Sequence, residues 1–512
     1  MSNPNDDVII IGAGVAGLSA ALHLAERGLS PLVFEADPQY CGGRLAGGDV
    51  VELDGWRFRS EHGVHGIWAS YRNLQAMLAR HTIRPAFVPA REETWICKRG
   101  GKVKKAAIGS AIRHSWIPAP LHYLALLLRP RFINIMDPRD WLSLPMVWYT
   151  LILAVGIDPL REGQPMEGMW LSDLIKGWSP TLRSFFVGFT RNGLSAHPEE
   201  IPAAGFVAFL RFYTLLRRDT WNFSYLPADG GTSIIDPMVG KLRTLGGAVQ
   251  MGTRVTHLKR EADGWRVHWQ RAGGEVGSTA ARRVILATDA PNTAKILHST
   301  DTTAAGLYWP RGLATVVVRF WFDRAPKPDA EAGIFSDDFI LDNFFWLHRI
   351  QTTWTGRHQY AQWHKATGGS ALEAHIYGPP ELLEEPDAPL LARAAADVRA
   401  AFPELRGHRI HQTLQRNPPT QTLFGLEQPE RHLSIETPWP SLYCCGDWVR
   451  HPAPALFLER ACLTGIEAAN AVLKACGLPV WPLLDYPPPE PFAGFLERLM
   501  QRGRARRRRH RR

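Results

Sequence analysis

Residues 8–44 read VIIIGAGVAGLSAALHLAERGLSPLVFEADPQYCGGR. The apolar run 8–11 predicts a buried strand, and a glycine-rich turn follows it at once. Small and apolar residues then recur at helical spacing up to Gly28, which predicts a helix with a glycine stop. A second apolar run, 32–34, predicts another strand, which ends at Glu35. Strand, glycine turn, helix and strand in this order form the βαβ unit that binds dinucleotides.

The turn has the spacing Gly12-x-Gly14-x-x-Gly17, and Glu35 lies 23 residues beyond Gly12. Gly12 and Gly14 allow a tight turn and a close approach of a pyrophosphate, and Gly17 lets the helix pack against the strand. The helix N-terminus offers free N–H groups and the positive end of its dipole to the phosphates. Glu35 can accept hydrogen bonds from ribose hydroxyls. The sequence therefore predicts a dinucleotide site, without choosing between NAD and FAD.

Signals of the same unit occur at two further places. Asp229-Gly230-Gly231 opens a helical stretch that is followed by strands, and near the C-terminus the apolar run 442–445 leads into Gly446-Asp447 and a helix rich in small residues. We therefore expect an α/β fold in which a Rossmann-like domain carries an inserted α+β domain for substrate and membrane. The Rossmann-like domain is expected to comprise residues 1–85, 225–300 and 430–480, and the inserted domain residues 86–224 and 301–429.

The composition places the excess charge at one end of the chain. The chain has 512 residues, 45% hydrophobic and 21% charged, which fits a large folded enzyme and excludes a disordered or fibrous protein. The formal net charge is +10, and residues 498–512 contain nine arginines and no acid. A nucleic-acid enzyme carries its basic charge on the folded surface. We therefore expect no nucleic-acid partner and favour an anionic membrane surface.

Several other classes of site find little support. Six cysteines without Cys-x-x-Cys spacing are too few for a disulfide scaffold and indicate a reducing compartment. His408 and His411 have no further ligand spacing around them, so no metal site is predicted. The start MSNPNDD runs straight into the first strand, which predicts neither a signal nor a transit peptide. We expect a cytoplasmic protein that associates peripherally with a membrane.

Two segments indicate membrane contact. Residues 141–157 carry no formal charge and are interrupted by Pro145. Because a spanning helix needs about 20 apolar residues, we interpret this region as an amphipathic or re-entrant surface element, with a core helix as the alternative. The tail 487–512 combines its arginines with an apolar helical stripe typical of an interfacial helix: Phe492, Phe495, Leu496, Leu499 and Met500. The alternative is a stripe docked on the protein body beside a solvated basic tail.

The turn Cys41-Gly42-Gly43-Arg44 follows the second strand. With it, the chain resembles the GG-motif FAD flavoproteins, which include amine oxidases, protoporphyrinogen oxidases and carotenoid desaturases. The resemblance implies an FAD-binding domain in which Gly42, Gly43 and Arg44 lie against the pyrophosphate and ribityl chain. The strand around Val255 resembles one whose backbone contacts adenine. The run ending in Gly446 and Asp447 resembles the C-terminal FAD motif, in which the Asp binds the ribityl or pyrophosphate region.

Three shorter runs resemble the carotenoid desaturase branch of that family. Glu61-His62-Gly63-Val64-His65-Gly66 and Tyr71-Arg72-Asn73-Leu74 resemble its acid- or His-Gly-x-His segment and its Tyr-x-Asn-Leu helix. Leu458-Glu459-Arg460-Ala461 has Arg where many relatives have Gly, as in the bacterial carotene ring desaturase/methyltransferases. The first run is nearer to the zeta-carotene desaturases, so both branches remain open.

Desaturation removes a hydride and a proton from adjacent carbons, and FAD can take the hydride. We expect the helix beginning near Leu458 to direct its N-terminal N–H groups at the flavin edge where negative charge develops, with Arg460 reinforcing this stabilisation. Glu61, His62 and His65 are the candidate proton acceptors, since the resemblance places them near the flavin ring. The alternative is that they hold the FAD shell or the local backbone, and that water or a distant group takes the proton.

Nineteen tryptophans and a strongly apolar insert favour a long hydrophobic substrate. We therefore predict an FAD-dependent oxidoreductase that desaturates a carotenoid or related isoprenoid at the membrane, where a quinone is the suggested electron acceptor. The alternatives are a redox-neutral carotenoid isomerase, a hydroxysqualene-type dehydroxylase, a flavin amine oxidase, and a flavin- and lipid-binding protein without turnover.

Overall fold

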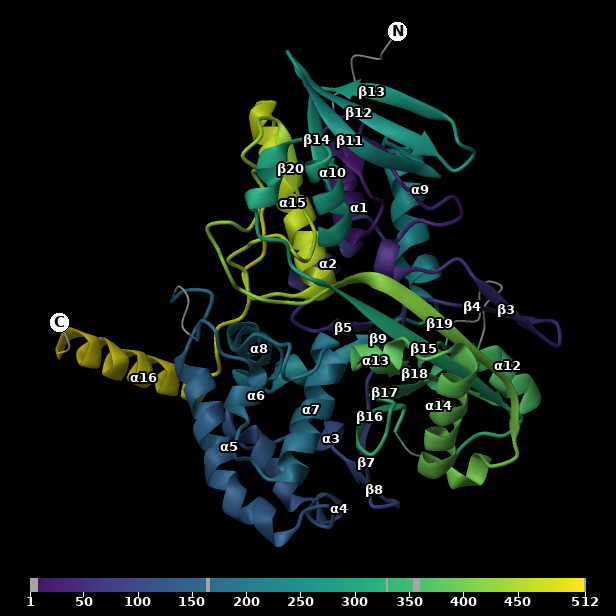
Figure 1. Ribbon diagram of the computed structural model, residues 1–512, viewed down its shortest axis with the longest axis vertical. Helices are drawn as coiled ribbons and strands as arrows, with labels where there is room; N and C mark the ends of the chain where they lie inside the picture. The colour runs from purple at the N-terminus through teal and green to yellow at the C-terminus, as the bar shows by residue number, and fades with distance from the viewer. Residues whose placement is uncertain (1–7, 163–165, 328–329, 353–359, 511–512) are drawn as a thin grey trace.

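A five-stranded sheet forms the centre of the upper half of the molecule (Figure 1). The computed structural model describes residues 8–162, 166–327, 330–352 and 360–510. The strand order is β10-β2-β1-β14-β20, and every neighbouring pair is parallel. The strands are β1 (Val8–Ile11), β2 (Leu32–Phe34), β10 (Ala248–Gln250), β14 (Arg283–Leu286) and β20 (Leu442–Cys444). The predicted Rossmann-like fold is confirmed. Its sheet is assembled from three separated parts of the chain, residues 8–34, 248–286 and 442–444.

Helices cover this sheet closely. Every residue of α1 (Val15–Ala25) is buried, and α1 packs against both α9 (Asp236–Thr244) and α15 (Phe457–Ala475). A Cβ at Gly465 of α15 would lie 2.3 Å from the carbonyl oxygen of Ala16, so small residues are what lets these two helices approach. α10 (Ala290–His298) follows β14. An antiparallel sheet lies above: β11 (Thr253–Glu261), β12 (Gly264–Arg271) and β13 (Val276–Ala281).

A seven-stranded sheet of order β19-β15-β18-β17-β16-β7-β8 organises the lower half (Figure 1). Its strands are β7 (Glu93–Arg99), β8 (Lys102–Ala107), β15 (Gly312–Phe322), β16 (Ala332–Asp337), β17 (Asn343–Trp346), β18 (Ser370–Ile376) and β19 (Arg409–Thr422). Only the pair β7–β16 is parallel among these neighbours, as the described residues show. α14 (Asp387–Ala401) buries its apolar side in the core beneath β15 and β18, and α7 (Pro180–Leu194) contacts β16.

Shorter elements connect the two halves. β5 (Gly66–Trp68) pairs with β9 (Phe223–Tyr225), which also pairs with β6 (Val88–Pro89), and β3 (Val50–Leu53) pairs with β4 (Trp56–Arg59). The remaining α-helices are α2 (Arg72–Arg80), α3 (Gly109–Arg113), α4 (Pro130–Ile133), α6 (Leu171–Leu174), α8 (Ala203–Leu210), α11 (Leu347–Ile350), α12 (Tyr360–Thr367) and α13 (Pro380–Leu383). Residues 211–215, directly after α8, form a π-helical turn.

The uncharged segment forms most of α5 (Pro138–Gly156), which runs through Pro145. Asp137 caps its N-terminus, and the Asp140 carboxylate accepts a hydrogen bond from the Asp137 N–H in return. One side of the helix is buried, whereas the other exposes large apolar side chains: Trp141, Leu142, Met146 and Tyr149. Within the described ranges, no helix has the length and apolar content needed to cross a bilayer.

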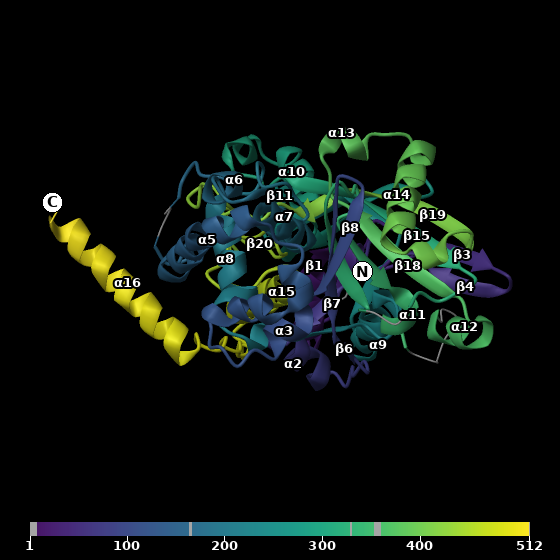
Figure 2. The same ribbon diagram turned by 90° about the horizontal axis from the view of Figure 1, so that it is seen from below.

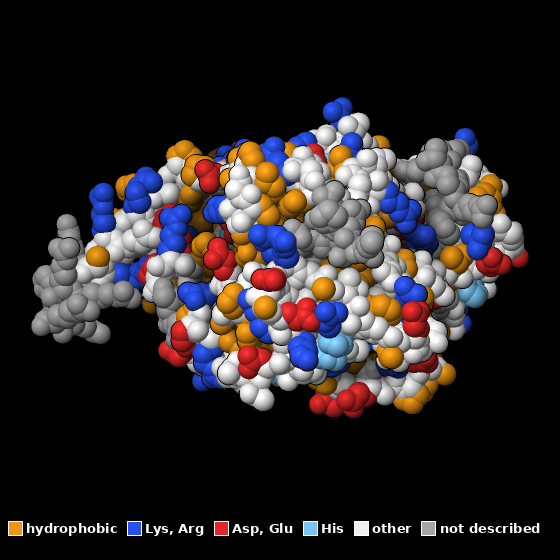
Figure 3. Space-filling view, turned by 90° about the horizontal axis from the view of Figure 1, so that it is seen from above, with side chains coloured by type: hydrophobic (Ala, Val, Ile, Leu, Met, Phe, Trp, Pro, Cys, Tyr) orange, Lys and Arg blue, Asp and Glu red, His pale blue; other side chains and the backbone are white. Residues whose placement is uncertain are grey.

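The C-terminal helix α16 (Pro491–His510) projects from the body beside α5 (Figure 2). Its apolar stripe divides: Leu496 packs against the core and Met500 lies against Gly156, whereas three others are exposed, namely Phe492, Phe495 and Leu499. Ion pairs from Glu497 to Arg211 and from Arg504 to Glu162 hold the helix on the body. Basic side chains gather along its described part (Figure 3).

All six cysteines are free. Cys444 and Cys445 are completely buried at the end of β20, where burial raises the pKa of both thiols.

Candidate active site

One large cavity is lined by residues of both sheets. Its volume is about 990 Å³, near the top of the roughly 300–1,000 Å³ typical of small-molecule sites. The carboxyl ends of the parallel strands open onto it, which is where α/β sheets bind their ligands. Nine of the ten predicted cofactor-binding residues line it: Gly12, Gly14, Glu35, Gly42, Gly43, Arg44, Val255, Gly446 and Asp447.

The tenth residue, Gly17, serves packing instead. A Cβ at Gly17 would lie 2.0 Å from the carbonyl oxygen of Gly12, so only glycine lets α1 follow β1 this closely. Gly14, by contrast, faces open space, since a Cβ there meets nothing within 4 Å. The Gly42 N–H donates to the Ala13 carbonyl at 2.9 Å, which places the second glycine turn directly on the first. Backbone alone therefore forms this part of the cavity wall.

Glu35 lies at the end of β2 with its carboxylate held in place. One oxygen accepts from the Ala13 N–H at 2.8 Å and the other from the Asp37 N–H at 2.9 Å. Burial raises the pKa of Glu35, and the two backbone bonds oppose this effect. The carboxylate is thus positioned at the cavity wall as a ribose acceptor requires.

Arg44 and Asp447 form an ion pair across the cavity wall, with 2.6 Å between Nη2 and Oδ1. The Asp447 oxygen also accepts from the Thr422 hydroxyl at 3.1 Å. Residues from the second glycine turn, the end of β19 and the turn after β20 therefore meet at one point. A guanidinium here can bind a phosphate, and the carboxylate can accept from a ribityl hydroxyl.

The N-terminus of α15 points into the same cavity. Phe457, Leu458 and Ala461 line it, and the N–H groups of this first turn have no intrahelical acceptors. Phe457 has φ +53°, a strained value for a large side chain, where the chain enters the helix. The helix dipole therefore favours negative charge on a group bound beside these residues.

Glu459 and Arg460 lie outside the cavity lining. The Arg460 guanidinium is buried and donates to four carbonyl oxygens of the preceding loop, those of Val449, His451, Ala453 and Ala455. The expected placement of Arg460 at the flavin edge does not match this geometry, because the helix turns the side chain toward the loop. Its contacts indicate a positioning residue that holds the loop between Asp447 and α15.

Glu459 instead joins α15 to the Tyr-x-Asn-Leu run. Its carboxylate accepts from the backbone N–H groups of Asn73 and Leu74, both at 2.9 Å, at the start of α2. The Asn73 side-chain amide and the Tyr486 hydroxyl add two more bonds, at 3.0 and 2.9 Å. A carboxylate at this position satisfies free N–H groups of α2 and complements its dipole. Two runs that the resemblance singled out are therefore structural partners.

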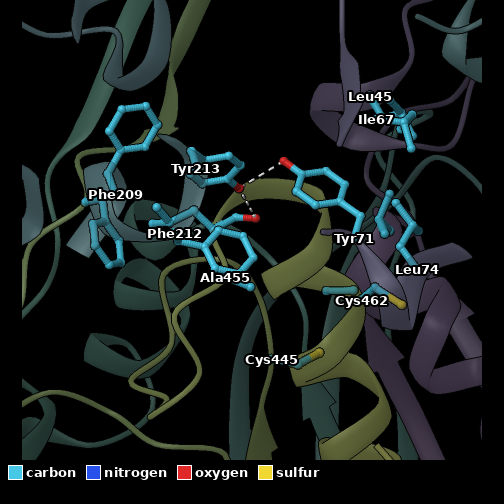
Figure 4. Close-up of a cluster of buried hydrophobic side chains, with 14 of the residues drawn as sticks. Leu45, Ile67, Tyr71, Leu74, Phe209, Phe212, Tyr213, Cys445, Ala455 and Cys462 are labelled. Atoms are coloured by element: carbon cyan, nitrogen blue, oxygen red, sulfur yellow. Dashed lines mark hydrogen bonds between the residues drawn. The ribbon is translucent and has the colours of Figure 1, made fainter. Parts of the chain in front are cut away.

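Tyr71 is also linked to the start of α15, through hydrogen bonds that involve Tyr213 (Figure 4). Its hydroxyl lies 3.0 Å from that of Tyr213, in the π-helical turn, and Tyr213 donates to the Leu456 carbonyl at 3.3 Å. Tyr71 lines the cavity, and both rings are buried among apolar side chains. The chain of hydroxyls thus links three helical segments at the point where α15 begins.

The candidate proton acceptors differ in their surroundings. Glu61 is buried outside the cavity lining, accepts from the Gly230 N–H at 2.5 Å, and has a pKa raised well above its usual value by burial. His62 lines the cavity with Nδ1 2.9 Å from the Ala46 carbonyl, and burial lowers its pKa. His65 also lines the cavity; burial lowers its pKa to about 4, and its Nδ1 has no hydrogen-bond partner among the described residues.

The 61–66 segment is held from the second sheet by residues that sequence analysis missed. Arg319 donates to the Glu61 carbonyl at 2.5 Å, Asn417 to the His62 carbonyl at 2.8 Å, and the Val64 N–H to Glu373 at 2.7 Å. These partners lie on β15, β19 and β18, far away in the chain. A charged residue inside an otherwise apolar strand was the only available signal.

Comparisons with known proteins agree with this geometry. Residues 171–473 match the family model described as flavin containing amine oxidoreductase, and residues 10–81 match that of an NAD(P)-binding Rossmann-like domain. The chain belongs to the flavin containing amine oxidoreductase family, and its cofactor is FAD. The bare glycine turns, Glu35 and the Arg44–Asp447 pair all suit this dinucleotide.

More particularly, the chain is an FAD-dependent oxidoreductase that is similar to enzymes of carotenoid synthesis. It is 22% identical to the carotenoid phi-ring synthase of Chlorobaculum tepidum, over 93% of this chain and 90% of that one. It is 25% identical to the carotenoid phi-ring synthase of Streptomyces griseus, over 92% and 88%. The 15-cis-phytoene desaturase of Narcissus pseudonarcissus is 21% identical, over 65% and 57%. The predicted family, cofactor and enzyme class are confirmed.

Solved structures show the same fold. Cyclohexylamine oxidase from Brevibacterium oxydans superimposes with a TM-score of 0.64 at 15% identity, over 93% of this chain and all of that one. A putrescine oxidase bound to putrescine has a TM-score of 0.62 at 14% identity, over 92% and 99%. The roles of individual site residues stay predictions.

Gly14→Ala tests whether the first turn is open because FAD occupies the space. Gly14 has an ordinary φ of −75° and a Cβ there meets no protein atom within 4 Å, so we expect an unchanged Tm without FAD. FAD affinity should fall at least about tenfold, since the methyl group meets the pyrophosphate. Flavin fluorescence titration and thermal melting measure the two effects. Gly240→Ala, in α9 with equally open space, is the matched control and should bind FAD normally. Normal FAD affinity in Gly14→Ala would contradict the assignment.

Proposed function

We propose that this protein desaturates a carotenoid at one end while docked on a membrane. The observation that carries the proposal is the large cavity, which joins the predicted FAD-binding turns to a lining rich in aromatic side chains: Trp68, Phe189, Phe209, Trp221 and Phe345. A polyene without charged groups binds by burial of apolar surface, at about 25 cal/mol per Å². Flat aromatic walls suit a flat conjugated chain.

The ring branch is the finer form of the proposal. The two phi-ring synthases match this chain over most of both lengths, whereas the phytoene desaturase from Narcissus matches a shorter part. Arg460 also stands where the ring desaturase/methyltransferases have it. These points favour reaction at a ring end over zeta-carotene desaturation.

FAD, when bound, supplies the hydride acceptor. The chain's own contribution is to bind the substrate, exclude water and stabilise developing charge. We assign the last task to the first N–H groups of α15, whose dipole favours an anion. Glu459 and Arg460 support this assignment because they hold the start of the helix against α2 and the preceding loop.

The membrane is the proposed source of the substrate. α5 and α16 lie side by side and expose apolar side chains near basic ones, notably Leu142, Phe495 and Leu499. Phenyl and leucyl groups partition into the acyl boundary, and each nearby Arg adds roughly 1 kcal/mol on an anionic leaflet. A membrane-borne quinone is the electron acceptor that we propose.

Expression in a carotenoid-producing bacterium tests the reaction. We expect new pigments that are lighter by two hydrogens for each desaturation, measured by chromatography and mass spectrometry. Gly14→Ala is the control and should give less product. Products of unchanged mass would indicate an isomerase. Loss of a hydroxyl oxygen from hydroxysqualene would indicate a dehydroxylase. Formation of peroxide from amines would indicate an amine oxidase. An unaltered pigment profile with retained lipid binding would contradict catalysis.

Co-sedimentation with vesicles tests the membrane surface. We expect the triple variant Leu142→Glu, Phe495→Glu and Leu499→Glu to bind anionic vesicles at least about tenfold more weakly, because each acid loses apolar insertion and is repelled by the lipid. Val276→Glu changes an equally exposed apolar residue on β13 and should bind normally. If the triple variant binds vesicles as well as Val276→Glu does, the proposal that α5 and α16 bind the membrane is contradicted.

A further inference from the structure

A chain of polar side chains leads from the second sheet to the cavity. Glu373 and His375 are two residues apart on β18, and Tyr377 follows directly after the strand. Because side chains two residues apart point to the same side of a strand, all three share one face of the sheet. Arg319 of β15 lies opposite Glu373 in the antiparallel register. His375 and Tyr377 line the cavity.

The four side chains are connected by short bonds. Arg319 Nε lies 2.7 Å from one oxygen of Glu373, and the other oxygen lies 2.9 Å from Nε2 of His375. Nδ1 of His375 lies 2.8 Å from the Tyr377 hydroxyl. Arg319, Glu373 and His375 are all buried. The network therefore runs without interruption from a fixed cation to a hydroxyl at the cavity wall.

The protonation states follow from these contacts. Burial opposes a charge on Glu373, but the Arg319 guanidinium and the bond from His375 outweigh it and lower the pKa of Glu373 to about 2. An ionised carboxylate accepts only, so His375 Nε2 carries the hydrogen and Nδ1 accepts from Tyr377. The Tyr377 oxygen accepts in turn from Asn343 Nδ2 at 3.1 Å. The hydroxyl is thus aligned to give its proton to His375.

The network touches the 61–66 segment. A Cβ at Gly63 would lie 3.0 Å from Nε2 of His375, and the Val64 N–H donates to Glu373. The family resemblance expects this segment beside the flavin ring. His375 therefore contacts a segment that the resemblance expects at the reacting end of the cofactor.

The sequence-derived candidates are less suited to accept a proton. Glu61 lies outside the cavity lining, and burial lowers the pKa of His62, which makes it a weaker base. Burial lowers the pKa of His65 to about 4, which makes it a weak base. His375 differs because the Glu373 carboxylate stabilises the positive charge that a transferred proton creates.

We propose that Tyr377 and His375 form the proton acceptor of the desaturation; this rests on the proposed function. FAD, when bound, would accept a hydride with its electron pair from one substrate carbon. The C–H bond of the adjacent carbon then breaks, its electron pair forms the new C=C bond, and its proton passes to the Tyr377 oxygen. The Tyr377 hydroxyl proton moves to His375 Nδ1, and the resulting imidazolium pairs with Glu373. Arg319 and Glu373 are positioning residues.

Tyr377→Phe removes the hydroxyl of the relay and keeps the aromatic ring. We expect flavin reduction at saturating carotenoid, followed anaerobically by absorbance, to slow about 100-fold, with carotenoid KM and FAD affinity nearly unchanged. The relay moves an exchangeable hydroxyl proton, so reduction of the wild-type enzyme should be slower in D2O than in H2O. Tyr377→Phe should lose this solvent isotope effect, which a purely structural defect would leave in place.

Tyr360→Phe is the matched control. The Tyr360 hydroxyl is buried near the charges of Arg319 and Glu373, has no hydrogen-bond partner among the described residues, and lies outside the cavity lining. We expect the wild-type rate and the wild-type isotope effect. Comparison with Tyr360→Phe therefore shows whether a change in rate or isotope effect comes from the loss of the Tyr377 hydroxyl in particular or from the loss of any buried hydroxyl in this region.

His375 offers a measurement that needs no turnover. In flavin-free protein labelled with 15N-histidine, NMR should show His375 as the Nε2–H tautomer, its signal identified by its absence in His375→Gln. His375→Gln should also slow flavin reduction like Tyr377→Phe. An Nδ1–H tautomer would overturn the proposal.

The outcomes separate this proposal from the function. If the wild type reduces its flavin with a carotenoid and Tyr377→Phe is as fast as Tyr360→Phe, the relay is overturned and desaturation stands. A slow Tyr377→Phe whose KM or FAD affinity weakens by the same factor also overturns the relay, because it indicates a binding role. A wild type that no carotenoid reduces overturns both.

Discussion

The cofactor site depends on a contact between two backbone turns. The Gly42 N–H bonds to the Ala13 carbonyl, and Gly42 has φ +116° with a virtual Cβ only 2.6 Å from the Ala46 Cβ. Neither the dihedral angle nor the spacing tolerates a side chain. This contact places the second glycine turn over the start of α1, at the edge of the sheet where the parallel strands β2 and β20 both end. Every later part of the site is built against that edge.

The seven-stranded sheet shapes the cavity as much as the five-stranded sheet does. Arg319, Glu373 and Asn417 bind the backbone of residues 61–66, so the shape of this segment is set by strands of the other half. The Arg319–Glu373 pair is buried, and removing one partner of such a pair typically costs about 3–5 kcal/mol. The conformation of residues 61–66 therefore depends on contacts from both halves.

Local signals explain what the sequence could predict. The glycine spacing and the turn at 42–44 report dihedral angles and close approach, and most of the residues they single out line one cavity. Helical phase decides which residues of α15 face the cavity: Leu458 and Ala461 share the face that lines it, and Arg460 points elsewhere. The network at Glu373 and His375 depends on Arg319, 54 residues away. The strand SALEAHI has a charged residue among apolar ones, but it does not indicate which distant residue is the partner.

The buried thiols at the end of β20 have a consequence for the chemical durability of the enzyme. Cys444 and Cys445 precede Gly446 and Asp447 at the cavity, yet their raised pKa keeps both sulfurs protonated. A protonated thiol is a poor nucleophile, and it reacts slowly with peroxide. Among the described residues at this end of β20, both thiols are therefore protected against adduct formation and against oxidation by peroxide.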